Sequence, residues 1–114
     1  MSDCLFCKIV KGDIPSSKVY EDESVYGFKD INPMAKDHYL FIHKKHSKDF
    51  IEQVSTDPTQ IIDIYKAIAK FTKEINLDQS GLRVVTNLGE NGGQTVFHTH
   101  FHVLGGEKLR GFGA

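Results

Sequence analysis

The sequence predicts an α+β fold, with a five-stranded antiparallel sheet, one long helix and one short helix. Three observations lead to this prediction. Short apolar runs alternate with turn residues at the spacing of strands, and one later segment repeats its apolar residues with a helical period. The 114 residues, of which 39% are hydrophobic and 25% charged, suit a single globular domain covering residues 1–114.

The first half of the chain contains the short helix and three of the strands. Residues 4–11 read as a short helix that ends in the turn at 12–15. Residues 18–21 and 25–29 read as a hairpin, and 39–43 as the next strand.

The second half contains the long helix and the last two strands. Asp57 is the expected N-cap and Pro58 the first helical residue. The apolar positions that repeat along this helix are Ile61, Ile64, Tyr65, Ile68, Phe71 and Ile75. Two strands, 82–87 and 96–104, follow and are joined by a glycine-bearing loop at 89–93.

Charge and hydropathy exclude two classes of partner. Fourteen Lys and Arg stand against fifteen Asp and Glu, without the basic stripe that binding to duplex nucleic acid requires. The apolar runs are far shorter than a membrane-spanning helix, and the first residues do not read as a signal peptide. We therefore expect a cytoplasmic protein that binds neither duplex nucleic acid nor membrane.

Three histidines alternate along the last predicted strand. A strand has a period of two, so His98, His100 and His102 are expected on one face. Such a face suits either metal binding or nucleophilic attack by an imidazole on phosphorus. The preceding run 92–95, Gly-Gly-Gln-Thr, offers backbone N–H groups, an amide and a hydroxyl to a phosphate, which favours the nucleophilic chemistry.

Cys4 and Cys7 form a C-x-x-C pair. In a reducing compartment this pair indicates a metal site or a redox site rather than a structural disulfide. No strand is predicted before Cys4, which disfavours a thioredoxin-like arrangement and leaves metal ligands or free thiols. His38 and His43 are expected to be solvated and are assigned no role.

Residues 98–104, His-Thr-His-Phe-His-Val-Leu, resemble the H-φ-H-φ-H-φ-φ signature of the histidine triad (HIT) family. Segments 4–9, 12–15, 28–33, 44–46 and 92–97, together with Asn87, resemble the nucleotide-binding branch of that family in order and spacing. Two positions depart from the pattern: Thr99 is polar where the signature is apolar, and His43 stands where many relatives have proline. The resemblance implies a HIT-like fold over almost the whole chain.

The resemblance also implies a purine nucleotide site. His100 matches the nucleophile and His102 the ligand of an α-phosphate oxygen, and the catalytic set is His98, His100, His102 and Thr95. The remaining matches comprise phosphate or leaving-group contacts, a ribose-binding acid and a base pocket. These are Asn87, Gly93, Gln94 and Thr95 for the phosphate, Asp30 for the ribose, and Phe6, Ile9, Phe28 and Ile31 for the base.

The implied activity is that of a purine nucleoside phosphoramidase, which cleaves adenylate or guanylate P–N bonds through a covalent nucleotidyl-histidine. The alternatives are a dinucleoside polyphosphate hydrolase and a nucleotide-binding or interaction module without turnover. No organic cofactor is implied. The resemblance further implies a structural zinc site at Cys4, Cys7, His46 and His98, and a homodimer formed through the long helix and a sheet edge.

Overall fold

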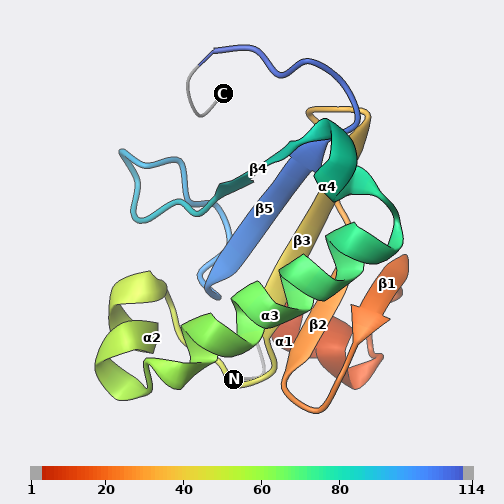
Figure 1. Ribbon diagram of the computed structural model, residues 1–114. Coiled ribbons are helices and arrows are strands. Elements are labelled where there is room, and N and C mark those ends of the chain that lie inside the picture. Colours follow the sequence, from red (N-terminus) through yellow and green to blue (C-terminus); the bar gives the residue numbers. More distant parts are fainter. Residues whose placement is uncertain (1–3, 112–114) are drawn as a thin grey trace.

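A five-stranded antiparallel sheet with the order β1-β2-β3-β5-β4 forms the centre of the protein (Figure 1). We describe it from a computed structural model, which describes residues 4–111. The strands are β1 (Lys18–Glu21), β2 (Val25–Lys29), β3 (Asp37–His43), β4 (Leu82–Val85) and β5 (His100–Gly105). The predicted α+β class and five-stranded sheet are confirmed.

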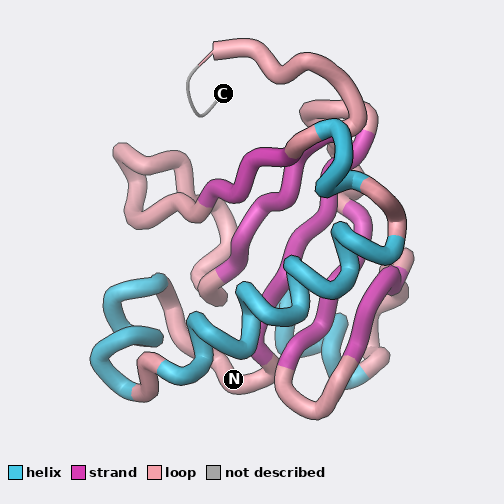
Figure 2. Tube along the Cα trace, in the orientation of Figure 1, coloured by secondary structure: helices cyan, strands magenta, loops and turns pink. Residues whose placement is uncertain are grey.

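The helices are more numerous than predicted. They are α1 (Leu5–Lys11), α2 (Phe50–Thr56), α3 (Thr59–Glu74) and α4 (Leu77–Ser80). The long α3 crosses one face of the sheet and α1 lies behind the other, as Figures 1 and 2 show. The prediction of one short helix was therefore incomplete, because α2 and α4 are also short helices.

The sequence does contain a signal for α2. Asp49 is its N-cap and accepts a hydrogen bond from the Glu52 backbone N–H at 3.0 Å, while the Glu52 carboxylate accepts one from the Lys48 N–H at 2.7 Å. This acid-x-x-Glu pattern resembles a capping box. Asp57 ends α2, and Pro58 takes the N-cap position of α3, one residue later than predicted.

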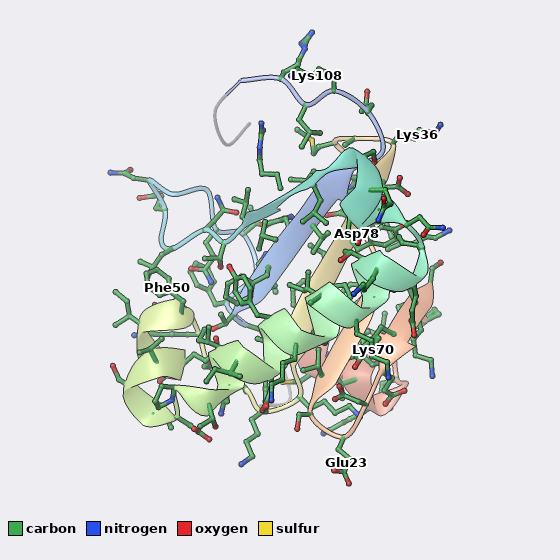
Figure 3. All side chains as sticks on the ribbon, in the orientation of Figure 1. Glu23, Lys36, Phe50, Lys70, Asp78 and Lys108 are labelled. Atoms are coloured by element: carbon green, nitrogen blue, oxygen red, sulfur yellow. The ribbon has the colours of Figure 1, made fainter. Side chains whose placement is uncertain are left out.

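The face covered by α3 is a closed apolar core. From the helix it takes Ile64, Ala67, Ile68 and Phe71, and from the sheet Val25, Tyr39, Phe41, Phe101 and Val103. Packing is tight here, since a Cβ added at Gly27 would lie 2.8 Å from the Phe41 ring. Lys70, labelled in Figure 3, is exposed on α3, as expected for an amphipathic helix.

The opposite face carries a smaller cluster under α1. Phe6 and Ile9 of the helix pack on the alternate residues of β2 and β3, which are Tyr26, Phe28, Leu40 and Ile42. Helix α1 ends at Gly12, whose φ of 87° closes the helix with hydrogen bonds to the carbonyls of Lys8 and Ile9. Seven residues of helix cannot cover five strands, so part of this face stays open.

Two predicted strands are shorter in the structure. The strand predicted at 82–87 ends at Val85, and the one predicted at 96–104 begins only at His100. Before His100 the chain turns away from the sheet, because the Thr99 N–H donates to the Ser47 carbonyl at 2.8 Å rather than to a neighbouring strand. Among the described residues, no helix has the length and apolarity needed to span a membrane.

Candidate functional site

Two imidazoles lie side by side on β5, on the face covered by α1. In the register with β3, His100 pairs with Ile42 and His102 pairs with Leu40. Because His100 and His102 are two residues apart, both point to the same side, and their ring centroids are 5.1 Å apart. His98 lies before the strand, so the predicted row of three on one strand holds for two of them.

Hydrogen bonding fixes the tautomer of His100. Its Nδ1 lies 2.8 Å from the His98 carbonyl oxygen. A carbonyl oxygen only accepts, so Nδ1 carries the hydrogen and Nε2 of the neutral ring has a free lone pair. His100 therefore has the tautomer that a nitrogen nucleophile needs.

His38 fixes the tautomer of His102 in the same way. The Met34 backbone N–H donates to His38 Nδ1 at 3.0 Å, so the hydrogen of neutral His38 is on Nε2. That Nε2 lies 2.9 Å from His102 Nδ1 and donates to it, which leaves His102 with its hydrogen on Nε2. His102 is thus held as a donor beside the lone pair of His100.

The expectation that His38 is solvated was wrong, because only 5% of its surface is exposed. Its side chain follows the same alternation as Leu40 and Ile42 on β3, which places it behind His102. The sequence signal for this position was a polar residue at a strand position where the alternation of side chains calls for a buried apolar residue. Asp30 completes the group, with its Oδ2 3.4 Å from His38 Nε2.

Burial keeps these imidazoles neutral. Desolvation lowers the pKa of His102 to about 4, with a smaller contribution from His100 and His38. Desolvation also lowers the pKa of His100 and of His38, while the nearby Asp30 opposes the shift in both. At neutral pH the lone pair of His100 is therefore available for attack.

A cavity of about 310 Å³ opens beside the two imidazoles. Eight of the predicted nucleotide-binding and catalytic residues line it: Phe6, Ile9, Phe28, Asp30, Ile31, Thr95, His100 and His102. The wall also includes polar residues that sequence reasoning did not single out, among them Ser16, Lys29 and Asn32. Ile31 is 91% exposed at the cavity, which leaves an apolar surface free to pack on a ligand.

Three residues that were predicted to bind phosphate do not line this cavity. They instead stabilise the loop that precedes Thr95. Asn87 Nδ2 donates to the Gly92 carbonyl at 2.7 Å. Gln94 Oε1 accepts from the Gly89 N–H, and Gln94 Nε2 donates to the carbonyls of Lys48 and Val96. Gly93 adopts a φ of 81°, which a turn at this point requires. These residues shape the loop that carries Thr95 to the cavity.

The second cluster consists of Cys4, Cys7, His46 and His98. Their ligand atoms all lie within 4.8 Å of one another. His98 Nδ1 is 3.3 Å from Cys4 Sγ and 3.5 Å from Cys7 Sγ, and His46 Nδ1 is 3.5 Å from Cys7 Sγ and 3.3 Å from His98 Nδ1. A tetrahedral zinc ion with these donors would place neighbouring ligand atoms roughly 3.3–3.8 Å apart. The residues therefore fit zinc.

His43 supports this cluster from behind. Its carbonyl accepts a hydrogen bond from His98 Nε2 at 2.9 Å, which leaves His98 Nδ1 free to face the thiols. The His43 ring accepts from the Lys45 N–H and lies 3.2 Å from Asp63 Oδ2 on α3. The expectation that His43 is solvated was wrong, since only 5% of its surface is exposed.

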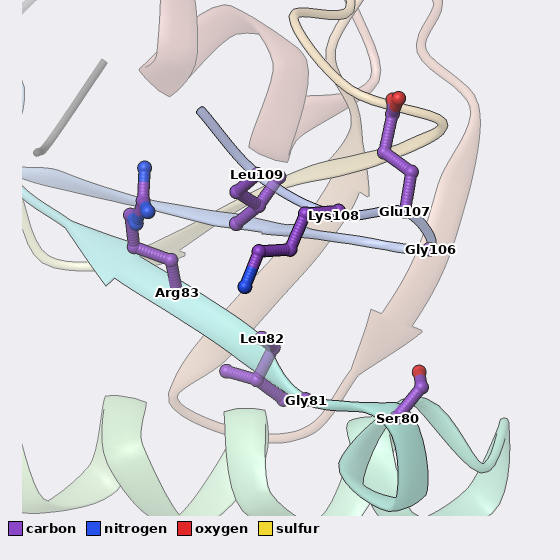
Figure 4. Close-up of a pocket in the computed structure, with 8 residues that line it drawn as sticks. All are labelled: Ser80, Gly81, Leu82, Arg83, Gly106, Glu107, Lys108 and Leu109. Carbon is purple, nitrogen blue, oxygen red and sulfur yellow. The ribbon is translucent and has the colours of Figure 1, made fainter. Parts of the chain in front are cut away.

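A larger cavity of about 500 Å³ lies at the other end of the sheet (Figure 4). It is bordered by 80–83 and 106–109, and its charged side chains are Arg83, Glu107 and Lys108. The Arg83 guanidinium already donates to the carbonyls of Arg110 and Gly111. This cavity contains no histidine or cysteine, so we place the candidate chemistry at the smaller one.

Comparison with known proteins agrees with the resemblance read from the sequence. The profile of the HIT domain matches residues 11–109. A histidine triad protein of Clostridium difficile is 45% identical, with 98% of this chain and 97% of that one covered and a TM-score of 0.94. A HIT family hydrolase of Clostridium thermocellum is 42% identical, with the same coverage and a TM-score of 0.93.

A third solved structure is a histidine triad nucleotide-binding protein of Candida albicans. It is 37% identical, with 89% of this chain and 73% of that one covered, and the TM-score is 0.81. The chain is therefore similar, over nearly its whole length, to proteins described as hydrolases and as nucleotide-binding proteins.

Proposed function

The chain belongs to the HIT domain family, and we propose that it hydrolyses purine nucleoside 5′-phosphoramidates through a nucleotidyl-His100 intermediate. The observation that carries this proposal is the tautomer of His100. Its Nδ1–H is bound to the His98 carbonyl, so its Nε2 lone pair is the free end, and the ring lines a cavity with the size and apolar wall of a small-molecule site.

In the first step, Nε2 of His100 forms a bond to the α-phosphorus and the P–N bond to the amine breaks. The leaving amine takes up one proton from solvent water, which the Thr95 hydroxyl on the cavity wall can relay, while neutral His102 keeps its Nε2–H and donates it as a hydrogen bond to an α-phosphate oxygen. The imidazole becomes cationic on attack, and its Nδ1–H bond to the His98 carbonyl stabilises that charge. Water then hydrolyses the new P–N bond and releases the nucleotide.

The apolar wall favours a purine base. Phe6 and Phe28 meet edge to face, with centroids 5.4 Å apart, and the exposed Ile31 lies at the same cavity. Phe28 and His102 are each paired to Leu40, on opposite sides, so two strand spacings of about 4.8 Å separate them. That separation leaves room for a ribose between a phosphate bound at His102 and a base bound at Phe28. Asp30 lines the same cavity, and its carboxylate can bind the ribose.

The test is amine release from adenosine 5′-phosphoramidate at neutral pH. We expect the wild type to turn over and His100→Ala to lose on the order of 10³-fold or more in rate, because the mutant lacks the nucleophile. Equal rates in both proteins would contradict the proposal. If neither protein cleaves the phosphoramidate, the two alternatives are tested next. Hydrolysis of a diadenosine polyphosphate would indicate the dinucleoside polyphosphate hydrolase, and AMP binding without any hydrolysis would indicate a binding module.

We also propose that zinc occupies the Cys4, Cys7, His46 and His98 cluster. Four nitrogen and sulfur donors leave no open coordination position, so the ion would supply structural cross-linking rather than an activated water. The support is the set of near-tetrahedral distances together with the His43 carbonyl behind His98. Elemental analysis of the purified chain should find one zinc per chain, reduced to background by Cys7→Ser.

A homodimer is the assembly that we propose. Strand β4 lies at one edge of the sheet, where its outer backbone groups are open to a partner strand. Exposed apolar side chains are also present on α3 and α2, where Ile62 is 54%, Tyr65 46% and Ile51 56% exposed. Sedimentation equilibrium at micromolar concentration should give twice the mass of the chain, and a monomer would contradict this.

A further inference from the structure

The side chain of Phe6 lies between the two candidate sites. Phe6 stands inside the C-x-x-C pair, on the first turn of α1, and only 4% of its surface is exposed. Its ring meets the rings of His100 and His98 edge to face, with centroids 5.1 Å and 6.0 Å away. It also meets Phe28 on the wall of the cavity. One side chain therefore contacts the nucleophile, a zinc ligand and the base pocket.

Few interactions hold α1 in place. A helix of seven residues is not stable alone. Its N-terminus is capped by Cys4 Sγ, which accepts from the Cys7 N–H at 3.2 Å. Only Phe6 and Ile9 of this helix are buried. Cys4 and Cys7 join it to His46 and His98, which belong to distant parts of the chain.

We propose that Phe6 is the positioning residue through which zinc binding favours nucleotide binding. This inference rests on the proposed nucleotide function and on zinc as the ion. When the thiols and imidazoles share the ion, α1 is fixed and the Phe6 ring is held against His100 and at the wall of the base pocket. Without the ion, α1 shifts or frays and the same ring must be ordered when the nucleotide binds. Zinc and nucleotide therefore bind with positive cooperativity.

The cooperativity is reciprocal, so the same coupling can be measured from the AMP side and from the zinc side. Isothermal titration of AMP into the zinc-loaded full chain and into the chelator-treated chain should give about 10-fold weaker binding after chelation. Conversely, saturating AMP should raise the zinc affinity by the same factor, measured by competition with a chromogenic chelator. Both measurements refer to the zinc-free chain, so circular dichroism must show that the chelator-treated chain is folded; if it is unfolded, AMP and zinc are coupled through folding rather than through Phe6, and the inference is overturned.

Two variants separate Phe6 from the rest of the pocket. Phe6→Ala should weaken AMP binding both with and without zinc. It should also bring the ratio of the two AMP dissociation constants, zinc-free over zinc-loaded, close to one, because the side chain that couples the two sites is missing. Phe28→Ala, on β2 rather than on the helix, should weaken AMP binding in both states and keep the ratio near 10. Zinc content is measured for each variant, so that loss of the ion is not mistaken for loss of the link.

Three results would contradict different parts of this inference. Equal AMP affinity with and without zinc, together with no effect of AMP on zinc affinity, would overturn the cooperativity and leave the proposed function intact. A ratio that persists in Phe6→Ala would overturn the role of Phe6. No AMP binding in either state would overturn the proposed function itself.

Discussion

The two faces of the sheet are built from the same strands but are covered very differently. On β5, Phe101 and Val103 point into the closed core under α3, while His100 and His102 point to the side of α1. Helix α3 has sixteen residues and α1 has seven. The longer helix seals its face with apolar side chains, and the shorter one leaves the cavity beside the imidazoles. The length of the covering helix thus decides which face can bind a ligand.

Truncating a side chain should cost more stability on the closed face, which α3 covers, than on the open face, which α1 covers. Phe71 of α3 packs against the rings of Tyr39 and Phe41, with centroids 4.9 Å and 5.5 Å away. Phe71→Ala should lower the free energy of unfolding by about 3–5 kcal/mol, because it leaves a void in a close-packed core. Phe28→Ala on the open face should cost less, because that ring already borders a cavity. Denaturant unfolding of both variants checks this, and equal losses would contradict the contrast.

Substitutions on the open face, which α1 covers, should change the activity more than substitutions on the closed face. His38→Leu removes the donor to His102 Nδ1, so the His102 tautomer is no longer fixed. We expect turnover to fall by about 10- to 100-fold, by analogy with the loss of a hydrogen-bond partner that orients a metal-ligating histidine. His38→Gln, which retains an N–H donor near the position of Nε2, should recover most of the rate. Equal rates for the leucine and glutamine variants would show that the donor does not matter.

The smallest expected effect is on the pH dependence of stability. Burial and two neighbouring imidazoles lower the pKa of His102 to about 4, whereas in the unfolded chain it is near 6.5. As pH falls below 6.5 the unfolded chain binds the proton first, so stability is lost between pH 6.5 and about 4. His102→Gln should lose less stability over this range. The loss of stability is measured for both proteins as the difference between the free energies of unfolding at pH 7 and pH 4.5. Zinc is removed from both proteins so that metal release does not contribute.

If His102→Gln and the wild type lose the same stability over that range, the pKa of His102 is not lowered in the folded protein. His102 would then titrate near 6.5 in the folded protein as it does in the unfolded chain, and His100 would have to be tested in the same way. The measurement on His100 would show whether the proposed nucleophile is neutral at pH 7.

Much of the fold follows from local patterns. The hairpin of β1 and β2 was predicted with its observed bounds, because alternation and turn residues act over a few positions. Helix α3 was predicted because its apolar residues repeat with a helical period. The start of β5 was predicted four residues too early, because the bond from the Thr99 N–H to the Ser47 carbonyl joins residues far apart in the chain. No local pattern contains such a contact.

The sequence by itself identified the candidate functional residues: the histidines of 98–102, the thiols of Cys4 and Cys7, and the residues that resemble a nucleotide pocket. Only the tertiary structure decided how they are shared between sites. It places His98 with the thiols, His100 and His102 beside the cavity, and the buried His38 behind His102. The physical reason is that donor direction, burial and tautomer depend on partners brought together by folding, whereas residue type and spacing are properties of the chain alone.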